Sequence, residues 1–234
     1  MRTPLSAEFD GLGERAWLNT AHQGAIPGRA AEAGRAAIER KRAPWKMEPD
    51  SWEVVPRRVR AALAGLIAAR EEDIVLATSA SYGLELLART LPLEPGDEVL
   101  LVDGDFPAPI YPWLPLRDRG IAVRLLAPET PLDADRLAGE LGPSTRVFCS
   151  SWVFSFSGRV VDPPAVGEAC AANGTTYIVN ATQAIGRARR PFTNCALTPS
   201  SARASSGCAA PTPPGSSGSP PAFATGSLTV PPTG

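Results

Sequence analysis

"DIVLATSASYGLELLARTLPLEPGDEVLLVD", residues 73–103, contains two short apolar runs on either side of a segment with a different period. The runs are residues 73–78 and 97–103, and their length and Val/Leu content are typical of buried strands. Between them, residues 79–91 repeat Leu and Ala at the spacing of one helix face. A strand, a crossing helix and a second strand together predict a parallel βαβ unit.

The same alternation extends in both directions along the chain. Further strands are expected at residues 121–127, 145–152 and 175–182, and further helices at 29–42, 52–70, 109–120, 133–142 and 164–174. Strands that alternate with helices of about ten residues predict an α/β fold with a mainly parallel sheet and helices on both faces.

The composition allows a buried core but indicates no charged partner. The chain has 234 residues, of which 44% are hydrophobic, and a formal net charge of −1, so neither nucleic acid nor an anionic membrane is expected as a partner. The four cysteines form no CxxC pair and there is one histidine, so no metal site is predicted. Residues 1–17 lack the apolar core of a signal peptide and no run is long enough to span a membrane, so we expect a cytoplasmic protein.

The composition changes abruptly after Phe192. Of the 42 residues from 193 to 234, 34 are Ser, Pro, Ala, Thr or Gly, and Arg203 is the only charged one. Such a segment has too little apolar side chain to offset the entropy lost on ordering, which predicts a disordered tail. We therefore expect an N-terminal segment (1–28), an incomplete large domain (29–192) and this tail.

Polar and aromatic residues follow several predicted strands, where ligands bind in parallel α/β sheets. Ser79 and Ser81 begin a helix, so their hydroxyls and the helix N–H groups could hold a phosphate; ordinary helix capping is the alternative. Phe106 could lie over a flat ligand or belong to the core. Asn180 and Gln183 need polar partners, and a ligand is one candidate.

Four stretches resemble the class V aminotransferases, the fold-type I group that includes cysteine desulfurases, kynureninase-like and isopenicillin-epimerase-like enzymes. They are "WLNTAHQGAIP" (17–27), "VLATSASYGLELLARTLPLEPGDEVLLVDGDFPAPIYPW" (75–113), "SSWVFSFSGRVVD" (150–162) and "YIVNATQAIG" (177–186). The resemblance covers about residues 15–192. It implies the pyridoxal-phosphate-binding large domain of a two-domain enzyme that acts on an amino acid and works as a homodimer.

Carried over position by position, the resemblance assigns Ser79, Ala80 and Ser81 to the turn that binds the cofactor phosphate. Phe106 matches the position that stacks on the pyridine ring. Desulfurases carry His at this position, so the phenylalanine counts against desulfurase chemistry.

The resemblance also assigns three polar side chains. Asn180 occupies the position of the aspartate that pairs with the pyridinium nitrogen; an amide cannot hold that proton by charge, which weakens the electron sink. Gln183 matches the residue that hydrogen-bonds the phenolic oxygen of the cofactor. His22 lies where the N-terminal segment of the family approaches the substrate; a surface imidazole is the alternative.

The Schiff-base lysine of the family is missing from its expected place. It should follow position 180 by about 25 residues, in a Gly-x-Lys-Trp context, but the chain has Ser205 and Ser206 there. Lys41 and Lys46, the two lysines of the sequence, fit no motif.

A shift of reading frame would account for both the tail and the missing lysine. Ser206-Gly207-Cys208 can be encoded AGT-GGC-TGC, and after a preceding A the overlapping frame reads AAG-TGG-CTG, which is Lys-Trp-Leu. We therefore hypothesise a frameshift between Ala188 and Thr193, which makes residues 193–234 an out-of-frame tail.

Two functional hypotheses from different classes remain. The first is a pyridoxal-phosphate enzyme for transamination, epimerisation or elimination, inactive in this chain because the lysine is absent. The alternative is a non-catalytic fragment or pseudoenzyme that binds a phosphorylated ligand or a full-length homologue. A plain nucleotide-binding domain is disfavoured because no GxGxxG follows any strand.

Overall fold

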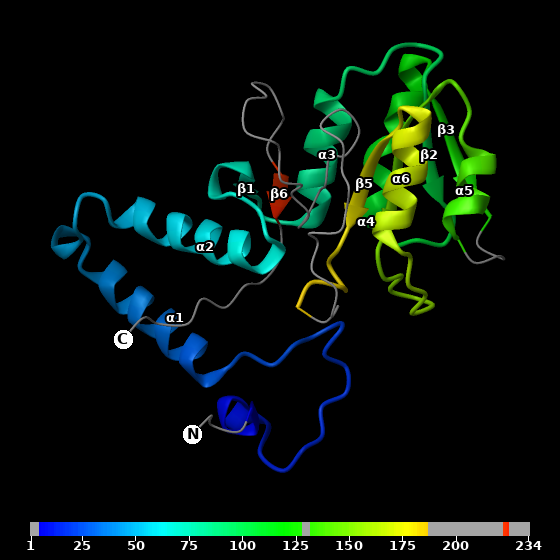
Figure 1. The fold of residues 1–234 in the computed structure, drawn as a ribbon. Coiled ribbons are helices and arrows are strands. Elements are labelled where there is room, and N and C mark those ends of the chain that lie inside the picture. Colours follow the sequence, from blue (N-terminus) through cyan, green and yellow to red (C-terminus); the bar gives the residue numbers. More distant parts are fainter. Residues whose placement is uncertain (1–4, 128–131, 187–221, 225–234) are drawn as a thin grey trace. The chain divides into compact units, whose positions relative to one another are not determined.

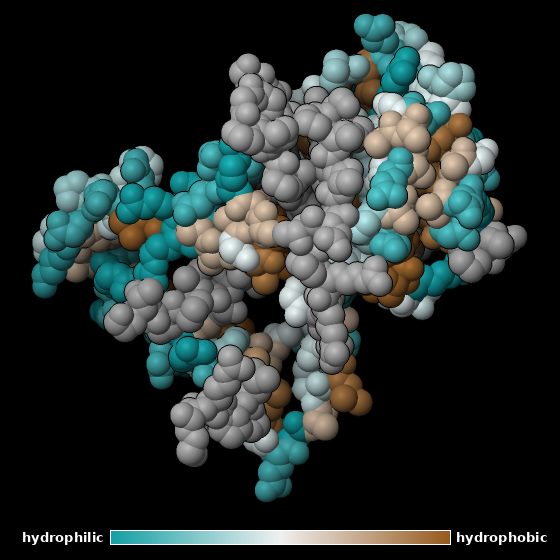
Figure 2. Space-filling model, viewed as in Figure 1, coloured by the Kyte–Doolittle hydropathy of each residue, from teal (hydrophilic) through white to brown (hydrophobic). Residues whose placement is uncertain are grey.

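The computed structural model describes residues 5–127, 132–186 and 222–224 of the chain. They belong to two compact units that divide between Ala62 and Leu63. The N-terminal unit contains the 3-10 helices η1 (Leu5–Leu12) and η2 (Pro44–Lys46), helix α1 (Gly28–Arg42) and the first turns of α2 (Ser51–Ile67). Helix α1 buries none of its residues, and its visible surface is largely hydrophilic (Figure 2).

A four-stranded sheet forms the centre of the second unit. In spatial order its strands are β3 (Ala122–Leu126), β2 (Glu98–Val102), β4 (Thr145–Ser151) and β5 (Thr176–Asn180). All neighbouring pairs are parallel, and the β4–β5 register places Ser151 opposite Asn180. The carboxyl ends of the four strands therefore lie along one edge of the sheet.

Helices cover both faces of this sheet (Figure 1), as the sequence pattern predicts. Across the sheet, the chain moves one way from β2 to β3 and the other way from β3 to β4 and from β4 to β5. Because such crossovers are right-handed, the helices of the first connection lie on one face of the sheet and those of the other two connections lie on the opposite face. One face carries α3 (Ala80–Thr90), α4 (Pro107–Ile110) and the 3-10 helix η4 (Tyr111–Arg119); the other carries α5 (Ala134–Glu140) and α6 (Pro163–Asn173).

Strand β2 is buried on both sides because each face of the sheet is covered. Val99 and Leu101 belong to the core cluster under α3 and η4, whereas Leu100 and Val102 alternate with them and are also buried. The cluster is completed by side chains from the helices and the other strands, among them Leu84, Leu87, Trp113, Leu116, Val147, Cys149 and Ile178. Within the described residues no helix has both the length and the apolar character that a membrane crossing requires.

The segment predicted as one helix at 109–120 is different in the structure. A single α-helical turn, α4, passes directly into η4. Pro112 and Pro115 have no N–H to donate to an i−4 carbonyl, so the segment takes the tighter 3-10 form. It ends at Gly120, whose φ of 76° suits glycine and whose added Cβ would lie 3.2 Å from Pro95.

The first predicted strand also differs from expectation. After the 3-10 turn η3 (Glu71–Asp73), β1 (Ile74–Leu76) is three residues long and is not hydrogen-bonded to the four-stranded sheet. It pairs in parallel with β6 (Ala222–Ala224). Apart from these three residues, the segment 193–234, predicted as a disordered tail, lies outside the described residues.

Candidate functional site

Polar side chains from three strand ends meet on one face of the sheet. Because side chains alternate along a strand, Ser151 lies on the same face as Cys149, and Asn180 lies on the same face as Ile178. Cys149 and Ile178 belong to the core under α3 and η4. Asp105 follows the end of β2 and is buried, with 4% of its surface exposed. The sheet therefore brings a carboxylate, a hydroxyl and an amide together at its carboxyl edge.

Hydrogen bonds join these groups into a continuous buried network. The Asn180 Nδ2 group donates to Ser151 Oγ at 3.1 Å, and the Ser151 N–H donates to Asp105 Oδ2 at 2.7 Å. The Phe106 N–H donates to the other carboxylate oxygen, Oδ1, at 2.6 Å. The hydroxyl and the N–H of Thr182 donate to Asn180 Oδ1 at 2.6 Å and 3.3 Å. The ends of β2, β4 and β5 are thereby held in fixed relation.

The electrostatic state of Asp105 reflects two opposed effects. Burial disfavours the charged carboxylate and raises the pKa of Asp105 above its ordinary value of 3.8. Hydrogen bonds with Ser151 and with the Phe106 N–H stabilise the anion and lower the pKa, but by less than burial raises it. A buried carboxylate with two backbone donors is a costly group to keep in a core, and it orients the polar groups around it.

The predicted phosphate turn begins helix α3. Ser79 is the N-cap residue, and its Oγ accepts from the Tyr82 N–H at 3.1 Å, so helix capping accounts for this hydroxyl. The N–H groups of Ala80 and Ser81 point along the first turn and have no acceptor within the described part of the chain. These two donors and the helix dipole make the turn suitable for an anion.

Phe106 lies between this turn and the buried network. Its side chain is 44% exposed, and its ring stacks on Phe156 with centroids 6.0 Å apart and planes 29° apart. Phe156 is carried by a hairpin after β4, in which Val153 and Val160 form an antiparallel bridge. Phe106 and Ser81 also line one pocket of about 290 Å³. The structure therefore brings the phosphate turn and the aromatic residue together.

The two remaining predicted site residues have different surroundings. Gln183 is half-buried in the turn that follows β5, where the N–H groups of Ala184 and Ile185 bond to the Ala181 carbonyl. His22 is exposed in a turn of the N-terminal unit, with its N–H bonded to the Asn19 carbonyl. Its proximity to a substrate stays a prediction.

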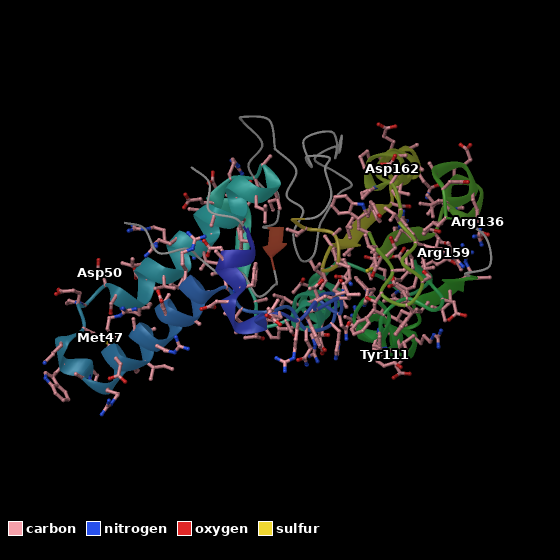
Figure 3. The ribbon with its side chains drawn as sticks, turned by 90° about the horizontal axis from the view of Figure 1, so that it is seen from below. Met47, Asp50, Tyr111, Arg136, Arg159 and Asp162 are labelled. Atoms are coloured by element: carbon pink, nitrogen blue, oxygen red, sulfur yellow. The ribbon has the colours of Figure 1, made fainter. Side chains whose placement is uncertain are left out.

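A second pocket, of about 330 Å³, opens at the ends of β2 and β3. It is lined by Arg136 of α5 and Arg159 of the hairpin, which Figure 3 shows apart from Tyr111, a residue of the first pocket. Arg136 donates to the Ala127 carbonyl at 2.9 Å. No group of three or more potential metal-binding side chains gathers anywhere among the described residues.

The pattern of one protein family matches most of the region that builds this site. The family described as aminotransferase class-V matches residues 53–195. This chain belongs to the class V aminotransferase family. The resemblance read from the sequence is thus confirmed, and so is the fold-type I α/β architecture that it implies.

Curated relatives include enzymes of more than one activity. A probable cysteine desulfurase of Methanothermobacter thermautotrophicus is 28% identical over 132 residues, covering 56% of this chain and 33% of the relative. An isopenicillin N epimerase of Streptomyces clavuligerus is 31% identical over 183 residues, covering 72% of this chain and 44% of the relative. The chain therefore spans less than half of the length of either relative.

Solved structures confirm the fold. The cystine C-S lyase C-DES in complex with its reaction product, cysteine persulfide, aligns with a TM-score of 0.72 at 23% identity, over 83% of this chain and 54% of that one. The apo cysteine desulfurase of Thermococcus onnurineus aligns with a TM-score of 0.71 at 16% identity, over 89% of this chain and 54% of that one.

The family uses pyridoxal phosphate, and most of the required groups are present for it. A phosphate fits the two N–H donors at the start of α3, a flat ring fits the exposed face of Phe106, and a ring nitrogen fits the buried Asn180 amide. Lys41 and Lys46 are the two lysines of the sequence, and both are exposed in the N-terminal unit. The residues at the strand ends fit the phosphate, the ring plane and the ring nitrogen of the cofactor.

Sequence reasoning assigned no role to Asp105, Ser151 or Phe156, although the first two lie at predicted strand ends. The sequence contains a partial indication for the first two. In its predicted strand Ser151 lies on the same face as Cys149, and Asp105 directly precedes Phe106, a predicted site residue. The register that places Ser151 opposite Asn180 depends on strand pairing, which one sequence does not specify. Phe156 reaches Phe106 through a hairpin that the alternation of strands and helices does not reveal.

Proposed function

We propose that residues 63–186 form the cofactor-binding part of a class V aminotransferase-type enzyme that acts on an amino acid. The observation that carries this proposal is the convergence of three unlike elements on one edge of the sheet. They are a helix N-terminus with two N–H donors that have no acceptor among the described residues, an exposed aromatic ring and a buried amide. Each matches a different part of pyridoxal phosphate, and one alone would have an ordinary structural explanation.

Each group has a defined task in this proposal. The N–H groups of Ala80 and Ser81 bind the phosphate, and the Phe106 ring orients the pyridine plane. Asn180 and Gln183 provide polar contacts to the ring nitrogen and the phenolic oxygen. When bound, pyridoxal phosphate supplies an electron sink for negative charge that develops on the substrate α-carbon.

We further propose that this chain does not turn over substrate. The sequence carries no lysine beyond Lys46, so the part of the chain that forms the strand ends has no lysine of its own to hold the cofactor covalently or to accept the substrate α-proton. The reaction of an intact enzyme, whether transamination, epimerisation or elimination, stays open. Phe106 in place of the histidine expected in desulfurases argues against desulfuration. The homodimer and the cytoplasmic location likewise remain predictions of the resemblance and the composition.

The proposal is tested by comparing the affinities of pyridoxal phosphate, pyridoxal and inorganic phosphate for the purified chain. Loss of the phosphate should weaken binding about tenfold, because two charge-assisted hydrogen bonds disappear. Phe106→Ala should weaken pyridoxal phosphate binding about threefold to tenfold through lost stacking, whereas Trp45→Ala, an exposed aromatic of the N-terminal unit, should leave it unchanged. Equal affinity for pyridoxal phosphate and inorganic phosphate would instead favour a module that binds any phosphorylated ligand.

A further inference from the structure

Phe106 and Phe156 are two exposed aromatic residues that contact each other beyond the ends of neighbouring strands. Phe156 is 72% exposed and Phe106 is 44% exposed, yet their rings stack with centroids 6.0 Å apart and planes 29° apart. This separation lies within the range of offset-stacked aromatic pairs. Because both rings remain open to water, burial in the core does not account for where they lie.

The backbone of Phe106 is fixed by Asp105. One carboxylate oxygen of Asp105 accepts from the Phe106 N–H at 2.6 Å, and the other accepts from the Ser151 N–H at 2.7 Å. Asp105 is buried, so both hydrogen bonds are shielded from competition with water. The residue that carries the first ring is thereby bound to the end of β4.

The hairpin that carries Phe156 begins at the same end of β4. At its base the Trp152 N–H donates to the Asn180 carbonyl at 3.0 Å, and nearer the tip the Phe154 N–H donates to the Arg159 carbonyl at 2.9 Å. The side chains of Trp152 and Phe154 are buried, so they anchor the hairpin below its exposed tip. Phe156 is therefore held at a defined position relative to the ends of β4 and β5.

We infer that Phe156 is a positioning residue for the cofactor ring: it packs against the Phe106 ring, fixes its rotamer and leaves the remaining exposed surface of Phe106 to a flat ligand. An exposed ring without such a neighbour exchanges between rotamers, and a binding-competent rotamer that is only partly populated lowers the apparent affinity. Phe156 removes this loss by orienting the ring before the ligand arrives. The inference rests on the proposed function for its cofactor part, whereas the effect on the Phe106 rotamer exists without any ligand.

The ligand-free effect is tested by nuclear magnetic resonance of the chain with ¹³C- and ¹⁵N-labelled phenylalanine, with the Phe106 signals assigned through Phe106→Leu. Three-bond couplings that depend on χ1 should show one Phe106 rotamer in the wild type and averaging between rotamers in Phe156→Leu. Val160→Ala is the matched control, because Val160 is an exposed apolar residue of the same hairpin, and it should preserve the single rotamer. A single Phe106 rotamer in Phe156→Leu, or averaging in the wild type, would overturn the inference.

The cofactor part is tested by comparing the affinities of pyridoxal phosphate and inorganic phosphate. Phe156→Leu should weaken pyridoxal phosphate binding about threefold, because the aromatic contact that orients Phe106 is lost. It should leave inorganic phosphate binding unchanged, since the proposed phosphate donors lie at the start of α3. Phe156→Tyr keeps the ring and should bind pyridoxal phosphate within about twofold of the wild type.

Two results separate this inference from the proposed function. Pyridoxal phosphate binding that is unchanged in Phe156→Leu, or weakened equally with that of inorganic phosphate, would overturn the inference and leave the proposed function intact. Failure of the wild-type chain to bind the cofactor at all would refute the proposed function, and the Phe106 couplings would still decide the role of Phe156.

Discussion

Ser79 and Ser81 are two serines of one turn with separable tasks. The Ser79 hydroxyl caps α3 through the Tyr82 N–H, whereas the Ser81 side chain lines the pocket beside Phe106. The sequence allowed both interpretations for both residues, capping and phosphate binding. Only the backbone geometry distinguishes them, because the cap belongs to the residue that precedes the first helical one.

This separation gives a prediction at the scale of single residues. Ser79→Ala should lower the free energy of unfolding by about 1 kcal/mol through loss of the cap. Ser81→Ala should change it by less than about 0.5 kcal/mol, as expected for an exposed residue without such a role. Urea denaturation of the two variants and the wild type provides the measurement. Equal losses of stability would show that the capping assignment is wrong.

At the scale of helices and strands, most of the large unit could be predicted from periodicity. The strands β2 to β5 and the helices α3, α5 and α6 lie within three residues of their predicted bounds, because local apolar period and glycine stops specify them. The exceptions have physical causes. Prolines convert the helix expected at 109–120 into a 3-10 segment, and β1 pairs with residues 222–224, a contact too distant in sequence for periodicity to reveal. The same is true of the site. The residues at the strand ends could be predicted from the sequence, but the hydrogen bonds between side chains of different strands could not.

Glu98 links three elements at the opposite, amino-terminal edge of the sheet. Its carboxylate accepts from Arg124 of β3 at 2.9 Å and from the Thr145 hydroxyl of β4 at 2.7 Å, and Arg124 also pairs with Glu140 of α5 at 2.8 Å. The hydrogen bond from Arg124 is the largest of the effects that lower the pKa of Glu98 below its ordinary value of 4.5. The ionised form of Glu98 is therefore more favoured in the folded chain than in the unfolded one.

Glu98→Gln should lower the free energy of unfolding by about 1 kcal/mol at neutral pH, allowing for the partial exposure of the Arg124 side chain. Because the folded-state pKa is depressed, the advantage of the wild type is present above pH 4.5 and is lost as the pH falls through the folded-state pKa of Glu98. Denaturation curves between pH 7 and acid conditions measure this convergence.

The control for this prediction is Glu85→Gln, which removes the surface pair with Arg89, 2.6 Å apart on α3. It should cost less than about 0.5 kcal/mol at any pH, because an exposed pair is screened by water. A pH-independent difference between Glu98→Gln and the wild type would contradict the assigned charge interaction.

At the scale of the whole molecule, the chain has most of the groups that would bind the cofactor at the strand ends, but the family match does not extend over the rest of its sequence. The family match ends at residue 195, ten residues before the place where the lysine is expected at 205–206. The composition of residues 193–234 and the overlapping Lys-Trp-Leu reading around Ser206 have one common explanation, a shifted frame.

The gene sequence tests that explanation. We expect the neighbouring frame, from about the codon of Ala188 onward, to encode Lys-Trp where this chain has Ser206 and Gly207, followed by further sequence that matches the family. A neighbouring frame without this lysine would refute the frameshift hypothesis. It would leave the proposed cofactor-binding site untouched.

The central claim, a cofactor site without its covalent anchor, is tested most directly by the intact mass of the chain after equimolar incubation with pyridoxal phosphate and reduction with borohydride. We predict binding with a Kd of about 100 μM or weaker, roughly −5.5 kcal/mol, because association must offset several kcal/mol of lost translational and rotational freedom without a covalent bond. We also predict that the mass of the reduced protein is unchanged. A stoichiometric adduct on Lys41 or Lys46 would contradict the account, since an existing lysine would then hold the cofactor.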